Sequence, residues 1–287
     1  MQRKNLIKTL KWLWFVCVIL GVTVYCVTNW ERLSRELRAI HWVDLGLGVL
    51  FLIVGKLLLV ELARISLEFQ GYSLTFSRQV YINSISQLGK YLPGGIWHFV
   101  GQAGFYRLDQ IPLKSATQAM MLENIWMILS AVMVGTLGCI WFLTDILTSI
   151  LLTAVLFGCW VGILWLMHKH ISLRLLVVQA GIWVALGLGF WTLLPDKSLF
   201  GLSIGAFSLS WVIGFISLFA PGGIGVREAA LAGIMGVAIN PTQALIYGGV
   251  NRLLWIITEI ILGVFVAQWL NARHHETWSD GVTEVKA

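Results

Sequence analysis

The chain has 287 residues, of which 58% are apolar and only 12% are charged, and its mean hydropathy is +0.82. Soluble domains carry about 25% charged residues, so this composition argues against a water-soluble protein and predicts a single, all-α integral membrane domain. The net charge of +6 does not indicate a nucleic-acid partner, because the basic residues mostly lie between apolar runs, where membrane orientation and anionic lipid account for them.

Seven apolar runs are each long enough to cross a bilayer, which takes a helix of about 20 residues. In chain order they are Trp12 to Asn29, Val43 to Ile65, Ala116 to Phe142, Ile146 to Met167, Leu175 to Leu194, Leu199 to Ala220 and Thr242 to Leu270. Basic residues precede the first run, but no small-residue cleavage site follows it, so we expect a retained span and not a signal peptide. The polar tail, 271–287, is expected to be a disordered end.

Two Pro-Gly-Gly breaks interrupt this pattern, and Pro221 of the second lies 128 residues after Pro93 of the first. Each break is followed, in the same order, by a short apolar piece, a second proline, a Thr-Gln-Ala triplet and a long apolar run. An ordered series at one offset indicates an internal repeat. We therefore predict two repeats, approximately 12–142 and 146–270, each with two spans, a broken hairpin and a third span.

The segments Arg78 to Arg107 and Leu199 to Met235 are the expected hairpins. If each enters the bilayer and returns, the chain has about six transmembrane helices plus two re-entrant hairpins, and its repeats are inverted, as in many secondary transporters. Lys and Arg collect in cytoplasmic loops, and their distribution favours a protein of the cytoplasmic membrane with both termini inside. The alternative makes Leu199 to Ala220 a full span, which places both breaks on the cytoplasmic side and the C-terminus outside.

The breaks are candidate binding elements, because proline and glycine let one helix stop and another start. Irregular backbone at membrane depth is tolerated where it is buried in protein or lines a wet cavity, and the N-terminus of a half-helix offers N–H donors to an anion. A structural kink or surface loop is the alternative. The candidates at the breaks are Pro93, Gly94, Gly95, Pro221, Gly222 and Gly223.

Charged residues near the breaks and inside apolar runs are the second set of candidates, since a charge at mid-helix costs about 2.5 to 3.5 kcal/mol on insertion scales. Arginine and lysine suit a phosphate, so Arg227, Arg252 and Lys90 are the expected headgroup contacts. Arg252 and Glu259 are seven residues apart and share one helix face. A structural salt bridge is the competing interpretation. The remaining candidates are Tyr91 and the carboxylates that could hold the cations or exchange protons, Glu123, Glu228 and Glu259.

Three further residues are weaker candidates. Lys56 and Glu61 can be explained by snorkelling or by the end of a span. His98 has no second histidine or acid at ligand spacing, so a packed or interfacial histidine is expected instead of a metal ligand. Gly-rich nucleotide motifs and a nucleophile elbow are also absent from the sequence, and we predict no catalytic residue, metal or cofactor.

Around the breaks, the chain resembles the transmembrane region family named after lysylphosphatidylglycerol synthase, which is also described as flippase-like. The likeness covers most of the chain and rests on Ala220-Pro-Gly-Gly-Ile-Gly-Val-Arg-Glu228 and on Ser84 to Gly95. The sequence departs from the family pattern at Ile96-Trp97-His98, where relatives often place a glycine and a polar or acidic residue, and at Asn124, where an arginine is common. The aminoacyl-transferring domain of the full-length synthases is missing, so lipid aminoacylation is not expected.

The resemblance implies a protein that moves, or helps to move, an anionic or aminoacylated phospholipid or a polyprenyl-linked lipid between leaflets. The expected partner is thus a membrane lipid or lipid-linked substrate. One alternative is a membrane enzyme with Glu123 or Glu228 as acid or base. Another is a scaffold subunit for a membrane-associated glycosyltransferase or lipid-modifying enzyme.

Overall fold

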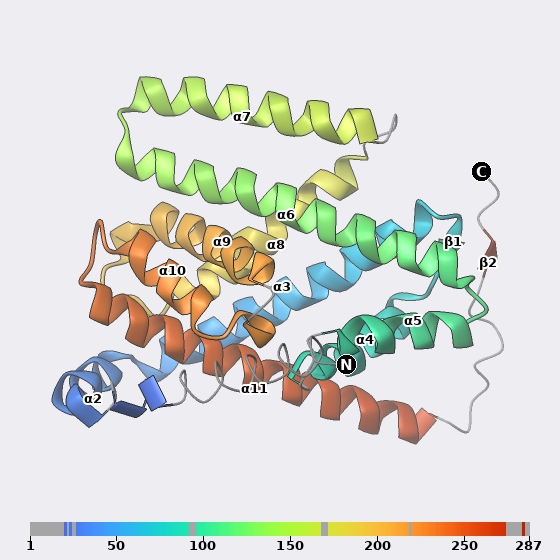
Figure 1. Cartoon of the computed structure of the whole chain (residues 1–287), viewed down its shortest axis with the longest axis horizontal. Coiled ribbons are helices and arrows are strands. Elements are labelled where there is room, and N and C mark those ends of the chain that lie inside the picture. Colours follow the sequence, from blue (N-terminus) through green and yellow to red (C-terminus); the bar gives the residue numbers. More distant parts are fainter. Residues whose placement is uncertain are drawn as a thin grey trace, which may run out of the picture.

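In a computed structural model, the chain is an assembly of long and short α-helices (Figure 1). The structure describes residues 20, 21, 23, 24, 27–91, 96–167, 172–217, 220–273 and 283–284. The α-helices within them are α2 (Trp30–Ala39), α3 (Trp42–Glu68), α4 (Phe76–Leu88), α5 (Trp97–Leu108), α6 (Leu113–Leu143), α7 (Ile146–Met167), α8 (Leu173–Trp191), α9 (Phe200–Ile216), α10 (Val226–Met235) and α11 (Pro241–Arg273). Three 3-10 turns are η1 (Gly89–Tyr91), η2 (Lys197–Leu199) and η3 (Pro221–Gly223). The two-residue strands β1 (Tyr72–Ser73) and β2 (Thr283–Glu284) pair antiparallel.

Six helical segments among the described residues are long and apolar enough to cross a membrane, which confirms the all-α, multi-pass prediction at that level. They are Trp42–Glu68, Leu113–Leu143, Ile146–Ile163, Leu173–Trp191, Lys197–Ile216 and Pro241–Val266. The fifth contains residues 199–216 of the run that we expected to form half of a hairpin, because η2 and α9 together reach the length of a span. Most of the predicted first span, 12–29, lies outside the described residues.

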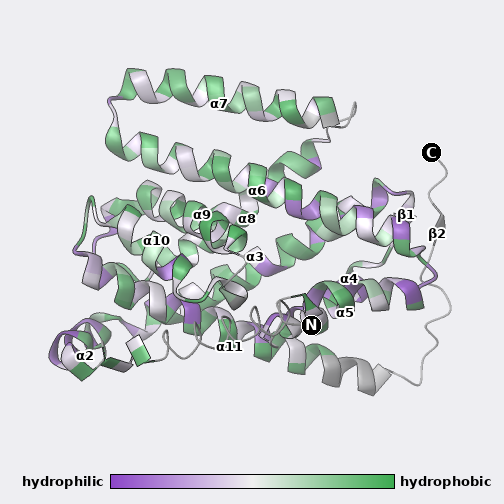
Figure 2. Cartoon of the chain, viewed as in Figure 1, coloured by the Kyte–Doolittle hydropathy of each residue, from purple (hydrophilic) through white to green (hydrophobic). Residues whose placement is uncertain are grey.

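The segment 271–287, which we expected to be a disordered end, overlaps two described elements. Helix α11 continues to Arg273, because the sequence Asn-Ala-Arg contains no helix breaker, and Thr283–Glu284 form β2. Hydrophilic residues gather on α2 and near the β1 end of α6, while α7 is largely apolar (Figure 2). This pattern fits helices that lie in lipid and carry their polar groups at their ends.

The two pairs of short helices lie toward opposite ends of the molecule. The chain turns back between α4 and α5 and between α9 and α10, and within each pair the two helices pack together. The α4 and α5 pair lies toward the end that holds β1, whereas α9 and α10 lie toward the end near α2 (Figure 1). The inner ends of both pairs therefore meet near the middle of the bundle, where η1 contacts η3.

Glycines bring α6 and α9 into close contact. A Cβ atom on Gly205 would lie only 2.8 Å from the carbonyl oxygen of Gly135 and 2.9 Å from the amide nitrogen of Cys139. Small residues are the usual means of bringing membrane helices into close van der Waals contact, because lipid supplies no hydrophobic drive for their association. Nearby, the Trp183 indole of α8 donates a hydrogen bond of 2.8 Å to Ser130 of α6.

Ion pairs tie the bundle together at the end that holds β1. Arg174 of α8 bridges Glu61 and Glu68 of α3. Glu61 also pairs with Arg64 of the same helix at 2.8 Å and lies inside α3, which ends at Glu68. In the α4 and α5 pair, Arg78 donates through Nε and Nη2 to both carboxylate oxygens of Asp109, a bidentate geometry that fixes the outer ends of the two helices.

At the opposite end, Glu36 fastens α2 to α11. Its carboxylate accepts hydrogen bonds from Gln243 at 2.8 Å and from Tyr247 at 2.6 Å. Partial burial works to raise the pKa of Glu36, but the bonds from Tyr247 and Gln243 and the charges of Arg32 and Arg35 outweigh it, so the pKa lies below 4.5. Helix α2 is thus held against the bundle by a charged carboxylate.

We expect Gly205→Leu to destabilise the protein by about 1 to 3 kcal/mol, because the new side chain must force α6 and α9 apart. The measurement is thermal unfolding in detergent micelles. Gly158→Leu, on α7, is the matched control, since a Cβ atom there meets nothing within 4 Å. Equal melting temperatures for the two variants would show that the helix contact does not limit stability.

The contact between α2 and α11 should depend on pH. Because the folded pKa of Glu36 is depressed below 4.5, its contribution is complete above that value and is lost as the pH falls through the lower, folded pKa. Glu36→Ala should therefore melt at a lower temperature than the wild type at pH 7. This difference should shrink below about pH 4.5. A difference that is constant over this range would contradict this assignment.

Candidate functional site

The carboxylate of Glu259 lies near the middle of α11 and gathers donors from three elements. Its Oε1 atom accepts from Lys56 of α3 at 2.8 Å, from Trp255 at 2.7 Å and from Lys90 of η1. Its Oε2 atom accepts from the Tyr91 hydroxyl. Both oxygens are thereby satisfied, and Glu259 is only 6% exposed. We predicted from their spacing that Arg252 and Glu259 share one helix face. Both side chains point into the bundle.

The interpretation of Lys56 as a snorkelling or span-end residue is wrong. Its side chain is 10% exposed and its ammonium group bonds Glu259 at 2.8 Å. The same ammonium lies 4.0 Å from the centroid of the Trp255 ring. A lysine at mid-helix in lipid needs such a counter-ion. The sequence around Lys56 could not reveal this ion pair, because Glu259 lies 203 residues away in the chain.

Trp255 also forms a platform for the neighbouring arginine. The Arg227 guanidinium of α10 lies 5.1 Å from the Trp255 ring and 4.5 Å from the ring of Phe207. Such cation–π contacts hold the side chain in place without neutralising its charge. Among the described residues, Arg227 makes no ion pair within 4.0 Å, although it is only 7% exposed. Its N–H donors therefore remain available to a ligand.

The second break forms a tight turn beside these cations. Gly222 and Gly223 have φ angles of 62° and 71°, which side chains on other residues rarely allow. Arg252 of α11 donates to the Gly222 carbonyl at 2.7 Å and lies 3.9 Å from a carboxylate oxygen of Glu228. Glu228 in turn accepts from the Gly225 amide at 2.7 Å and so caps the start of α10. The turn thus fixes both arginines relative to one another.

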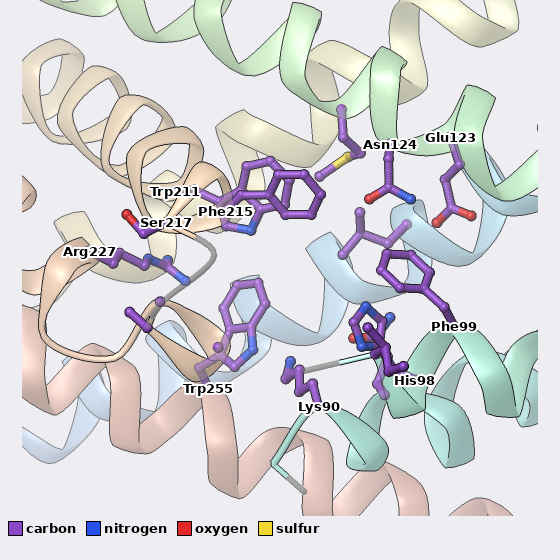
Figure 3. Close-up of a pocket in the computed structure, with 18 of the residues that line it drawn as sticks. Lys90, His98, Phe99, Glu123, Asn124, Trp211, Phe215, Ser217, Arg227 and Trp255 are labelled. Atoms are coloured by element: carbon purple, nitrogen blue, oxygen red, sulfur yellow. The ribbon is translucent and has the colours of Figure 1, made fainter. Parts of the chain in front are cut away.

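A cavity of about 440 Å³ opens in front of this cluster. One end is lined by Lys90, Arg227 and Arg252, together with Gly222 and Gly223. At the other end are Glu123 and Asn124 of α6, and Figure 3 places them across the cavity from Arg227. The middle of the wall is largely aromatic, with Trp211, Phe215, Phe99 and Trp255. The cavity therefore has a cationic end, an aromatic middle and an acceptor end.

Part of the cavity wall is formed by residues that face outward from the bundle. Ile96 and Phe215 line the cavity and are 59% and 37% exposed, and the adjacent Ile216 is 63% exposed. In a membrane, side chains exposed on this face contact lipid. A molecule in the cavity can thus contact cations and the apolar surroundings together.

The structure brings most of the sequence candidates together. Lys90, Glu123, Gly222, Gly223, Arg227 and Arg252 line the cavity. Glu259 pairs with Lys90 and accepts a hydrogen bond from Tyr91, and Glu228 lies beside the two arginines. Pro221 begins η3. The remaining three, Pro93, Gly94 and Gly95, lie outside the described residues.

Several cavity residues were not selected from the sequence. Gln102 and Asn124 are isolated amides, and Trp211 and Trp255 are two of 15 tryptophans, so no motif distinguishes them. His98 also lines the cavity, with its Nδ1 atom buried and without a hydrogen-bond partner. In the part of the chain that the structure describes, no group of three His, Cys, Asp or Glu residues is placed to hold a metal ion.

Neither a comparison with profiles of known protein families nor a comparison with curated proteins gives a match for this chain.

Replacing Glu259 should expose its structural role. Glu259→Gln leaves the buried Lys56 without its counter-ion, and breaking a buried pair in this way costs about 3 to 5 kcal/mol. We expect thermal unfolding in detergent micelles to show a large loss for Glu259→Gln and a partial recovery when Lys56→Met is added. A single variant as stable as the wild type would rule out this role for the carboxylate.

Proposed function

We propose that this chain is a transporter-like membrane protein that binds the phosphate of an anionic phospholipid or polyprenyl-linked lipid and moves the headgroup across the cytoplasmic membrane. The observation that carries this proposal is the state of Arg227. Its guanidinium is buried at the cavity wall, is held by two aromatic rings and has no ion-pair partner among the described residues. A buried cation without a direct ion pair is costly inside an apolar bundle, and an anionic ligand would lower that cost.

The geometry around Arg227 favours a phosphate group. Arginine offers a planar fork of N–H donors that matches phosphate oxygens, and Arg252 and Lys90 line the same end of the cavity. Lys90 is already partly neutralised by Glu259, so it can contribute a donor without adding a fully unpaired charge. A single phosphate at this end would receive donors from three elements, α10, α11 and η1.

The apolar side of the cavity favours a lipid over a free anion. A water-soluble phosphate would make no use of outward-facing residues such as Ile96, Phe215 and Ile216. A lipid places its headgroup at the cations and its chains against exposed apolar surface. The resemblance to the flippase-like family at the second break points to the same class of substrate.

An inverted repeat is the topology that we propose for this function. The bounds of α3, α4, α5 and α6 correspond, after a shift of about 128 residues, to those of α8, α9, α10 and α11. The α4 and α5 pair and the α9 and α10 pair lie toward opposite ends of the bundle (Figure 1), which supports re-entrant hairpins that enter from opposite faces of the membrane. The basic residues Arg78, Arg107, Lys114 and Arg174 lie at the end that holds β1, so we assign this end to the cytoplasm.

In this mechanism, the headgroup leaves one leaflet, binds near the bilayer midplane and continues to the other leaflet. The two repeats rock about the fixed site, as in transporters of this general plan. The Glu259 cluster joins α3, η1 and α11 and keeps Lys90 in place at the cavity wall. The phosphate thereby exchanges water for donors that are already oriented.

Lipid flipping in proteoliposomes tests the proposal. Phosphatidylglycerol labelled on an acyl chain is incorporated, and its movement is followed by chemical quenching of the outer leaflet. Loss of one hydrogen bond to a charged group costs about 1.5 to 3 kcal/mol, so Arg227→Ala is expected to slow flipping by about tenfold or more. Arg227→Lys should retain part of the rate, because lysine keeps the charge without the fork.

Arg107→Ala is the matched control, since Arg107 is exposed on α5 and does not line the cavity. Its flipping rate should equal that of the wild type. Normal flipping by a folded Arg227→Ala protein would refute the phosphate site. If no protein flips the lipid, a scaffold subunit or a membrane enzyme becomes the better description.

A further inference from the structure

Helix α2 is too short to cross the bilayer. Its 10 residues reach about 15 Å at the rise of an α-helix, which is half the thickness of the hydrocarbon layer. The extended backbone of Ile40 and His41 separates α2 from α3, so α2 does not prolong that span. Figure 1 shows α2 nearly end-on, while α6 and α7 run across the page. Helix α2 therefore lies across the direction of the spanning helices.

One side of α2 is apolar and largely exposed. Glu36 points toward α11 and holds α2 against the bundle. At 3.6 residues per turn, Trp30, Leu33 and Leu37 share the neighbouring face of the helix. Trp30 is 63% exposed and Leu37 is 42% exposed. In a membrane protein, such a face suits the boundary between headgroups and acyl chains.

The side of α2 that faces away from the bundle is basic. Arg35 and Arg38 are exposed and lie three residues apart, so they share this face. Together with Arg32, they outnumber the two glutamates of the helix. Within the part of the chain that the structure describes, none of these three arginines makes an ion pair within 4.0 Å. Their N–H donors are therefore open to groups outside the protein.

Neighbouring residues mark this level of the molecule as a membrane interface. Trp42, which begins α3, is 87% exposed. One turn further, Asp44 pairs with Lys197 at 3.4 Å, and the Lys197 ammonium lies 5.4 Å from the centroid of the Trp191 ring. Tryptophan and lysine are typical of the zone where hydrocarbon meets headgroups. Because only two residues join α2 to this end of α3, α2 lies at the same level.

We infer that α2 is a docking surface for anionic membrane lipid. Trp30 and Leu37 insert at the edge of the hydrocarbon layer, and Arg35 and Arg38 bind the phosphates of negatively charged headgroups. An amphipathic helix that lies flat in the interface is held by apolar burial and by electrostatic attraction together. Zwitterionic lipid leaves the arginines without a net counter-charge. The partner is the membrane surface and not a lipid in the cavity, so this inference is independent of the proposed function.

Amide hydrogen exchange tests this docking. The full-length protein is placed, one copy per disc, in nanodiscs of phosphatidylcholine alone or of an equal mixture with phosphatidylglycerol. We expect the amides of Trp30–Ala39 to exchange about tenfold more slowly in the mixed discs, because α2 must release two arginine–phosphate contacts before it opens. Exchange in α7 should be the same in both discs and serves as the internal reference.

Arg35→Gln/Arg38→Gln removes two charges and keeps good helix formers. In phosphatidylcholine discs, this variant should exchange as the wild type does, which shows that its fold is intact. In the mixed discs it should lose the protection of α2, by about tenfold. Arg107→Gln/Lys114→Gln is the matched control, since both cations are exposed on other helices, and it should keep the wild-type protection of α2.

Equal exchange of α2 in the two kinds of disc overturns the inference. Protection that survives in Arg35→Gln/Arg38→Gln also overturns it, because the arginines would then not be the lipid contacts. Protection that appears only in discs with two copies of the protein assigns this face to a second copy of the chain instead of lipid. If α2 is protected as expected but no lipid is flipped in proteoliposomes, the docking surface stands and the proposed function fails.

Discussion

A carboxylate shared by four donors at the centre of α11 is the interaction on which the rest of the site depends. Lys56 and Lys90 approach Glu259 from α3 and η1, and Trp255 and Tyr91 complete its hydrogen bonds. Without this acceptor, two ammonium groups would face each other in an apolar bundle. The cluster therefore fixes the position of η1, and with it the wall of the cavity, by the requirement that buried charges be paired.

The same requirement separates supporting residues from binding residues. Glu259 and Tyr91 have their polar atoms committed to neighbours, so they support the wall. Arg227 and Glu123 line the cavity, at its two ends, without an ion pair among the described residues. Arg227 is buried without a direct ion pair in the described part of the chain, and the aromatic middle of the cavity separates it from Glu123. This arrangement is the basis for proposing a lipid ligand whose phosphate lies at the arginine end.

Much of the fold could be predicted because membrane helices are set by local composition. The runs beginning near Val43, Ala116 and Ile146 each appear as one helix, and the breaks in the pattern fall between helices. Arg227 and Arg252 could be selected because charges stand out in apolar sequence. The role of α9 was harder to assign, since its 17 residues and η2 have the length of a span while η3 turns the chain back into α10.

The sequence by itself determined that this is a helical membrane protein with a repeated helix break and a few intramembrane charges, because length, hydropathy and glycine–proline chemistry act locally. Only the tertiary structure decided how those charges are paired. Lys56 and Glu259 are 203 residues apart, and Glu123 faces Arg227 across a cavity that no spacing predicts. Which charges are neutralised and which remain for a ligand follows from the packing of helices that are distant in the chain.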